Sequence, residues 1–178
     1  YNVKAGAINE IIEKTSSMFA RTKKEVRVRL QLAGDAWAVE VDRGQIEQVL
    51  LNLYINAWQA MPDGGDLFLI TENLNLDENY VRPYKVKPGR YVKVSVADTG
   101  VGIDKKDLER IFEPFFTTKE MGRGTGLGLA SVYGIIKSHG GHINVYSEPG
   151  QGTTFNFYLP ASSRKAVEEP TAEAAVMR

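Results

Sequence analysis

The 178-residue chain contains no cysteine, which excludes disulfide bonds and thiolate-ligated metal sites. It also lacks net charge, because 22 Lys and Arg residues balance 22 Asp and Glu residues. The composition therefore gives no electrostatic reason to expect a nucleic acid or an anionic membrane as a partner. No apolar run approaches the ~20 residues that span a bilayer, and no signal-peptide pattern opens the chain. We expect a cytoplasmic domain without direct membrane contact, which a longer parent protein could still anchor to a membrane.

The composition that remains is typical of a soluble globular protein, with 43% hydrophobic and 25% charged residues. The length suits one domain with a substantial core. We expect that domain to span residues 1–161, with its core in residues 36–160. From Ser162 the composition turns to Ala, Glu, Lys and Pro. This change predicts a disordered tail or linker over residues 162–178.

Apolar residues at helical spacing predict four helices. Asp42 and Gln45 resemble a capping box at the start of the second helix. Gly140 follows the last helix and can adopt the left-handed conformation that ends helices. The predicted helices are Ala5–Arg21, residues 43–61, Lys105–Phe112 and Leu127–Ser138.

Alternation of apolar and polar residues predicts strands between these helices. Asn73–Gly89 is expected to be a long polar connection, and Pro114–Thr125 a mobile loop. Strands of this kind suit an α/β two-layer sandwich, in which helices cover one face of a sheet. The predicted strands are Val26–Leu32, Trp37–Val41, Leu67–Thr71, Tyr91–Asp98, His142–Ser147 and Thr153–Leu159.

Asp98 ends the most regular of these strands and shares the parity of Val94 and Val96, so its carboxylate faces the apolar side. A carboxylate placed there needs a partner, and an adenine amino group is a suitable donor. Gly100 and Gly102 follow and allow a ligand to approach the backbone. The alternative is an aspartate that only caps the next turn.

Three carboxamide side chains are spaced by four residues and share one face of the second predicted helix: Gln48, Asn52 and Asn56. Carboxamide oxygens are hard ligands that suit Mg²⁺, which prefers few protein ligands together with phosphates and waters. The alternative is a solvated polar face without a ligand.

The glycine-rich segment Gly122–Gly128 stands before a helix, where free N–H groups and the helix dipole attract phosphate. It is not a dinucleotide fingerprint, because a polar loop rather than a strand precedes it. A P-loop is excluded because the chain has no Gly-Lys pair. The alternative is a flexible hinge.

Thr153 shares the parity of Phe155 and Phe157, so its hydroxyl faces the same interior as Asp98. The alternative is a β-branched residue that only favours a strand.

Residues from about Ala36 to Pro160 resemble the catalytic, ATP-binding domain of sensor histidine kinases, in the group that includes gyrase, heat-shock chaperone and mismatch-repair ATPases. The resemblance implies the Bergerat fold, a mixed, mostly antiparallel sheet covered on one face by helices. Five motifs stand in the family's order: Gln48–Ala60 (N-box), Asp98–Ile103 (first glycine box), Ile111–Lys119 (F-box), Gly122–Ala130 (second glycine box) and Gly150–Phe155.

The resemblance also implies residue roles. Asp98 would bind the adenine amino group of ATP, with Thr153 supporting it through water. Asn56 would bind Mg²⁺, with Asn52 as a second candidate ligand close to the phosphates, and Phe112–Arg123 would form the ATP lid. The catalytic candidates are Asn52, Lys119 and Arg123. The remaining ATP-binding candidates are Gly100, Gly102, Ile103, Thr118, Lys119, Gly124, Thr125, Gly126, Leu127 and Gly128.

Two features depart from the family pattern. Gln59 occupies a position where many such kinases have a basic residue, and we expect Lys119 or Arg123 to supply that charge. No phosphoacceptor histidine followed by an acidic residue is present, and His139 and His142 are assigned to structure. We therefore expect a monomeric fragment of a homodimeric parent.

The resemblance implies an ATP:protein-histidine phosphotransferase. Its partners would be the dimerisation and phosphoacceptor domain of the same parent and a response regulator receiver domain. A clamp ATPase and an anti-sigma-type serine kinase are alternatives, but both groups usually carry Glu at the position of Asn52. A non-catalytic nucleotide-binding module is the remaining alternative.

Overall fold

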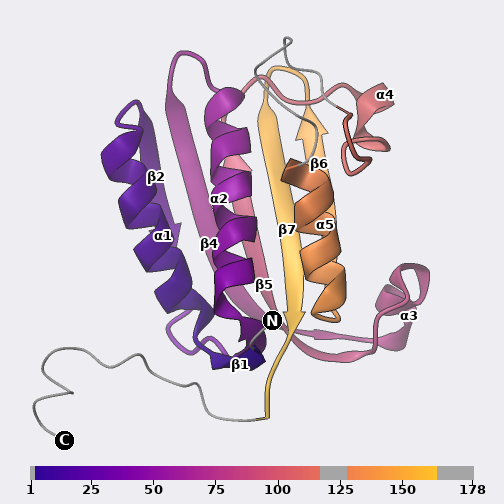
Figure 1. Ribbon diagram of the computed structural model, residues 1–178. Helices are drawn as coiled ribbons and strands as arrows, with labels where there is room; N and C mark the ends of the chain where they lie inside the picture. The colour runs from indigo at the N-terminus through magenta and orange to yellow at the C-terminus, as the bar shows by residue number, and fades with distance from the viewer. Residues whose placement is uncertain (1–2, 117–127, 164–178) are drawn as a thin grey trace, which may run out of the picture.

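The computed structural model describes residues 3–116 and 128–163, which form two layers (Figure 1). One layer is a five-stranded sheet with the order β2-β4-β5-β7-β6, and the helices α1, α2 and α5 lie on one of its faces. β2 pairs with β4 in parallel, and the other neighbouring strands pair antiparallel. The predicted two-layer fold is confirmed. The strands are β2 (Val26–Gln31), β4 (Gly65–Leu76), β5 (Gly89–Asp98), β6 (His142–Glu148) and β7 (Gly152–Pro160).

The covering helices are α1 (Ile8–Thr22), α2 (Arg43–Gln59) and α5 (Gly128–Ser138). α1 buries Ile8, Ile11, Ile12 and Phe19, a spacing that places them on one side of the helix. α2 begins as predicted, because the Asp42 carboxylate accepts a hydrogen bond from the Gln45 main-chain N–H at 3.2 Å. The apolar sides of these helices and the facing side of the sheet form one hydrophobic core.

A two-stranded sheet, β1 (Val3–Gly6) with β3 (Val39–Asp42), lies at one end of the molecule (Figure 1). The predicted first helix was wrong at its start, because Ala5 lies in β1 and the helix begins at Ile8. β1 is held by its antiparallel pairing with β3, and four residues of local sequence do not reveal such a pairing.

The predicted polar connection Asn73–Gly89 is largely ordered structure. β4 continues to Leu76, because its last residues pair with the first residues of β5. A short helix α3 (Glu78–Val81) and a 3₁₀ turn η1 (Arg82–Tyr84) follow. The helix predicted over Lys105–Phe112 is confined to α4 (Lys105–Leu108). Figure 1 shows α3 and α4 at opposite ends of the sheet.

The C-terminal end of α5 closes as predicted. Gly140 has a φ of 74°, and the Gly141 N–H donates to the Ile136 carbonyl at 3.0 Å. The neighbouring His139 ring bonds the Ile135 carbonyl through Nδ1 at 2.8 Å and accepts from the Asp42 N–H through Nε2 at 3.1 Å. These bonds give His139 a structural role, because they tie the end of α5 to the residue that caps α2.

Within the described ranges, no helix combines the length and the apolar character needed to cross a membrane.

Candidate functional site

Asp98 lies at the carboxyl end of β5, and its side chain is only 7% exposed. Its Oδ1 atom accepts hydrogen bonds from the main-chain N–H groups of Gly100 at 2.8 Å and Thr153 at 3.2 Å. Within the described part of the chain, Oδ2 accepts no hydrogen bond. Burial raises the pKa of this carboxyl, although the two N–H groups oppose the effect. A buried carboxylate with one unused oxygen is suited to accept a hydrogen bond from a ligand.

Three polar residues form a row across neighbouring strands beside this carboxylate. Asp98 on β5 is opposite Thr153 on β7, which is opposite Ser147 on β6. The hydroxyls of Ser147 and Thr153 are 2.8 Å apart, and Ser147 Oγ also donates to the Gly152 carbonyl at 3.0 Å. Thr153 therefore faces the interior next to Asp98, as its parity predicts.

The loop after Asp98 is fastened to the end of α2. The Val101 N–H donates to the Ala60 carbonyl at 2.9 Å. Gly100 packs so closely that a β-carbon at this residue would lie 2.4 Å from the same carbonyl oxygen. The glycine is thus required for contact with α2, and the loop cannot move away from the helix without losing this bond.

The same loop is also fastened to β6 and the turn that follows it. Gly102 has a φ of 76°, and a β-carbon there would lie 2.2 Å from the Glu148 carbonyl oxygen. The Ile103 N–H donates to Ser147 Oγ at 2.8 Å, and the Gly150 N–H donates to the Val101 carbonyl at 2.7 Å. Gly102 and Ile103, both predicted to bind ATP, lie in this fixed loop beside Asp98.

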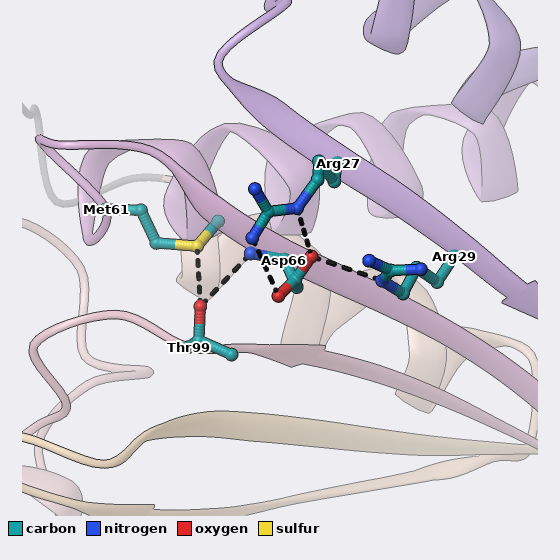
Figure 2. Close-up of polar contacts among 5 residues, drawn as sticks. All are labelled: Arg27, Arg29, Met61, Asp66 and Thr99. Carbon is teal, nitrogen blue, oxygen red and sulfur yellow. Dashed lines mark hydrogen bonds and ion pairs between the residues drawn. The ribbon is translucent and has the colours of Figure 1, made fainter.

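Thr99 connects the loop to the start of β4, as Figure 2 shows. Its Oγ1 atom accepts from the Asp66 N–H at 3.1 Å and lies 3.6 Å from Met61 Sδ. The Asp66 carboxylate accepts from Arg27 at 2.8 and 3.2 Å and from Arg29 at 3.2 Å. The bonds from Arg27 hold the pKa of Asp66 below its usual value. Asp98 is therefore supported by β4 on one side and by β7 on the other.

The carboxamides on α2 face the beginning of α5. Gln48 Nε2 donates to Ser131 Oγ at 3.1 Å, and Asn52 Nδ2 donates to the Gly128 carbonyl at 3.3 Å. The Asn52 bond uses the amide nitrogen, so the oxygen that would ligate a metal is not used in it. Asn56 follows one turn later, is half-buried and lies one turn before Ala60, which holds the loop after Asp98.

Gly128 is the first residue of α5, where the opening N–H groups of a helix have no partner within the helix. A β-carbon at Gly128 would meet no atom within 4 Å among the neighbours that the structure describes. Six of the predicted ATP-binding residues lie outside the described residues: Thr118, Lys119, Gly124, Thr125, Gly126 and Leu127. The catalytic candidate Arg123 lies outside them as well.

These residues fit an adenine nucleotide. The unused oxygen of Asp98 can accept from an amino group, and α5 presents its opening N–H groups toward the same end of the sheet as Asp98. Among the described residues there is no group of three or more His, Cys, Asp and Glu side chains that could hold a metal. A metal here would depend on the oxygens of Asn52 and Asn56 together with phosphate oxygens, as Mg²⁺ prefers.

Several contributors were missed by the sequence analysis. Ser147 holds both Thr153 and Ile103, and the Ala60 carbonyl holds the loop after Asp98. Gly152 packs against the Asp98 main chain. Ser147 has the parity of the inward-facing residues of its strand, but only the register of β6 against β7 identifies Thr153 as its neighbour.

Comparison with known proteins identifies a family for this chain. Residues 41–163 match the family described as histidine kinase-, DNA gyrase B-, and HSP90-like ATPase. The chain is 44% identical over 168 residues to the sensor kinase CckA of Brucella abortus, which covers 93% of this chain. It is 40% identical over 144 residues to sporulation kinase E of Bacillus subtilis, which covers 81%. The chain spans 17% of the length of each of these relatives.

Solved structures show the same fold. The catalytic domain of the histidine kinase ThkA has a TM-score of 0.74 and 30% identity, over 90% of this chain and 97% of that one. Full-length ShkA in complex with AMPPNP has a TM-score of 0.74 and 26% identity, over 93% of this chain and 32% of that one. ThkA in complex with the response regulator protein TrrA has a TM-score of 0.69 and 28% identity, over 90% and 42%.

Proposed function

Because the chain belongs to the histidine kinase-, DNA gyrase B-, and HSP90-like ATPase family, we propose that it is the ATP-binding catalytic domain of a sensor histidine kinase. It transfers the γ-phosphate of ATP to a histidine on a separate dimerisation domain of its parent protein. The observation that carries the proposal is the buried Asp98 carboxylate with an unused oxygen at the end of β5. The relatives named above support the kinase assignment, since both are kinases by name.

Adenine recognition depends on the geometry around Asp98. Two main-chain N–H groups fix Oδ1 and thereby hold Oδ2 in one orientation. Little conformational entropy of this side chain is therefore lost when a ligand binds. Oδ2 accepts the adenine amino group, and Thr153 contributes through water from the adjacent strand. A guanine base presents a carbonyl oxygen at the corresponding position, which a carboxylate repels. We therefore expect ATP to be preferred over GTP.

The phosphates lie between α2 and the start of α5. The opening N–H groups of α5 bind phosphate oxygens, and the oxygens of Asn56 and Asn52 would hold Mg²⁺. The metal neutralises charge on the phosphates when it is bound. Positioning and electrostatic stabilisation of this kind supply most of the catalysis in phosphoryl transfer. Lys119 or Arg123 supplies the positive charge that many such kinases carry at the position of Gln59.

Asn52 favours a kinase over a clamp ATPase. A carboxamide cannot take a proton from water, so the α2 residue nearest the start of α5 does not activate water for attack. The nucleophile instead comes from another domain, where a neutral imidazole attacks the γ-phosphate directly. This chain contributes the bound and oriented nucleotide.

The proposed partners follow from this division of roles. One is the dimerisation and phosphoacceptor domain of a homodimeric parent, and the other is a response regulator receiver domain in the cytoplasm. The complex of ThkA with a response regulator supports the second partner, and the complex of ShkA with AMPPNP supports adenine nucleotide as the ligand.

The proposal is tested by mixing the chain with Mg²⁺ and γ-labelled ATP, with and without the separately produced dimerisation and phosphoacceptor domain. We expect label on that domain and no label on this chain. Asp98→Asn should lower labelling about 10- to 100-fold at subsaturating ATP, because the amide presents a donor where the adenine amino group needs an acceptor. Rapid ATP hydrolysis by the chain alone would favour the clamp ATPase, and tight ATP binding without label would favour the non-catalytic module.

Asn52 is tested against a matched residue on the same helix face. Asn52→Ala should lower the rate of label transfer about 10- to 100-fold at saturating ATP, because a ligand of the metal and phosphates is lost. Gln48→Ala removes the carboxamide one turn earlier, which bonds Ser131, and should leave the rate within about twofold. Equal losses in both variants would contradict a specific role for Asn52.

A further inference from the structure

A second cavity of about 1000 Å³ opens at the end of the sheet that is remote from Asp98. Its walls come from the turn η1 and the start of β5 on one side, and from the C-terminal half of α5 and the start of β6 on the other. Figure 1 shows this end of the sheet beside α3, whereas the proposed nucleotide site lies at the end that carries α4.

The two sites are well separated. Arg90 lines the cavity and lies on the same strand as Asp98, eight residues before it. At about 3.3 Å per residue, the two positions are roughly 26 Å apart. Helix α5 runs between the same two ends of the domain, with Gly128 toward the nucleotide end and Lys137 at the cavity. The cavity is therefore not an extension of the ATP site.

The cavity is strongly basic although the chain as a whole is neutral. Four cations line it, namely Lys85, Lys87, Arg90 and Lys137, and no Asp or Glu is among its lining residues. None of these cations has a carboxylate partner within the described residues. Burial lowers the pKa of Lys137, as expected for a cation that lacks a compensating charge. Cations gathered in a concave surface without anions attract a negatively charged ligand.

Aromatic rings complete the wall. The Tyr84 ring lies 3.9 Å from the His142 ring, centroid to centroid, and the His142 ring also stacks with the Tyr158 ring at 5.7 Å. The Tyr84 ring also contacts the Tyr80 ring at 5.6 Å, and Tyr84 is still 36% exposed, so part of its surface remains open. Tyr133 also lines the cavity and is 41% exposed. An open ring surface next to cations suits a planar group that carries phosphate, because stacking and charge then act together.

Two further observations point to a ligand rather than an ordinary basic surface. His142 is only 5% exposed, and its Nε2 atom has no hydrogen-bond partner among the residues that the structure describes. A buried polar atom of this kind is costly unless something completes it. Lys85 adopts a left-handed backbone conformation with a φ of 57°, which is unfavourable for a residue with a side chain. Such conformations gather at ligand-holding segments.

We infer that this cavity is a second ligand site, which binds a phosphorylated small molecule with a planar ring, the chemistry of a nucleotide. Lys85, Lys87 and Arg90 contact the phosphate, and a ring of the ligand stacks on Tyr84. The cavity volume is at the upper end of the range for small-molecule sites, so it accommodates a ligand larger than a mononucleotide. This site is independent of the proposed ATP site and of the phosphotransfer reaction.

The test uses the whole chain with Asp98→Asn, which weakens adenine binding at the proposed ATP site and so separates the two sites. Inorganic phosphate, AMP, GMP and the dinucleotide pApA are titrated by calorimetry. We expect the dinucleotide to bind most tightly and phosphate most weakly. We also expect the ring-proton resonances of His142 to shift on binding, which locates the ligand independently of its heat.

Charge reversal supplies the matched comparison. In the Asp98→Asn background, Lys85→Glu with Lys87→Glu should weaken dinucleotide binding about 10- to 100-fold, since two attractions to phosphate are replaced by two repulsions. Lys24→Glu reverses an exposed lysine outside the cavity and should leave binding unchanged. Tyr84→Ala should weaken the dinucleotide more than it weakens phosphate, because only the dinucleotide has a ring to stack.

Three results would each overturn the inference. One is the absence of dinucleotide binding at millimolar concentration to the Asp98→Asn protein. Another is equal weakening by the cavity and Lys24 substitutions, which would indicate general charge attraction. The third is binding of an acidic peptide such as hexaglutamate in preference to every nucleotide, which would make the cavity a protein contact instead. Circular dichroism of each variant excludes unfolding as the cause of lost binding.

Discussion

A β-carbon added to Gly152 would lie 2.1 Å from the main-chain oxygen of Asp98. Gly152 opens β7, has a φ of 115°, and is followed by Thr153, whose N–H holds the Asp98 carboxylate. Backbone contact and backbone conformation therefore both require glycine at this position. Main-chain packing between β5 and β7 therefore positions the side chains of the candidate site.

Gly152→Ala should destabilise the domain by about 2 kcal/mol or more and weaken ATP binding, because β7 must shift away from Asp98. Urea unfolding and calorimetry with ATP measure the two effects. Gly134→Ala is the matched control, since Gly134 lies inside α5 and its added carbon meets no atom within 4 Å. That change should stabilise the helix by roughly 0.5–1 kcal/mol. Equal stability of the two variants would contradict the packing argument.

Asp98→Asn should raise the stability of the nucleotide-free domain at neutral pH while weakening ATP binding about 10- to 100-fold. The amide keeps an oxygen for the N–H groups of Gly100 and Thr153 but removes a buried charge. Burial raises the pKa of Asp98, so the folded state favours the protonated form. The stability of the unsubstituted chain therefore falls as pH rises from the ordinary carboxyl range through the raised pKa.

Urea unfolding of both proteins between pH 4 and pH 7.5 isolates this effect, because all other carboxyl groups are common to them. The stability gained by Asp98→Asn should be small at the acid end and largest at neutral pH. A gain that is independent of pH would show that the charge of Asp98 does not cost stability.

Ser147→Ala should destabilise the domain by about 1–3 kcal/mol. The hydroxyl accepts from the Ile103 N–H, donates to the Gly152 carbonyl and contacts the Thr153 hydroxyl. ATP affinity should also fall, since Thr153 loses the group that orients it. Ser17→Ala, at an exposed position of α1, should change stability by less than about 0.5 kcal/mol. An ATP affinity that is unchanged in Ser147→Ala would contradict the orienting role.

His142 should make the domain sensitive to mild acid. Burial, reinforced by the charge of Lys137, lowers the pKa of His142 to about 4. The neutral ring is favoured in the folded state, so its contribution to stability is complete above the ordinary histidine pKa of about 6.5 and is lost as pH falls from there toward 4. NMR titration of the ring protons gives the pKa directly.

His142→Phe keeps a ring between Tyr84 and Tyr158 but takes up no proton. The difference in unfolding free energy between this variant and the unsubstituted chain should change in the variant's favour as pH falls from 6.5 to 4. A difference that stays constant over this range would show that His142 titrates alike in the folded and unfolded states.

Local patterns in the sequence were sufficient for the parts of the site that depend on one segment. The parity of Asp98 within its strand predicted its burial, and the pairing of Asp42 with Gln45 predicted the start of α2. Spacing by four residues placed Gln48 and Asn52 on one face, where both now bond α5. These signals are local because strand and helix periodicities are properties of consecutive residues.

The rest depends on pairings between distant segments. Ser147 contacts Thr153 because of the register between β6 and β7, and β1 exists because Val3–Gly6 pairs with β3. The stack of Tyr84 on His142 joins a residue from the predicted polar connection and a residue from the start of a strand. No periodicity within one segment encodes such contacts, so only the folded structure reveals the second cavity.

The bond between His139 and Asp42 has a mechanical consequence for α5. Near its C-terminal end the helix is held by the bond from the Asp42 N–H to His139 and by the buried side chain of Ile136, whereas its first residue bonds α2 through a single amide contact from Asn52. The exposed first residue of α5 is therefore attached less firmly than the residues near His139, and the opening turn is the part of the helix that adjusts most easily to a bound phosphate.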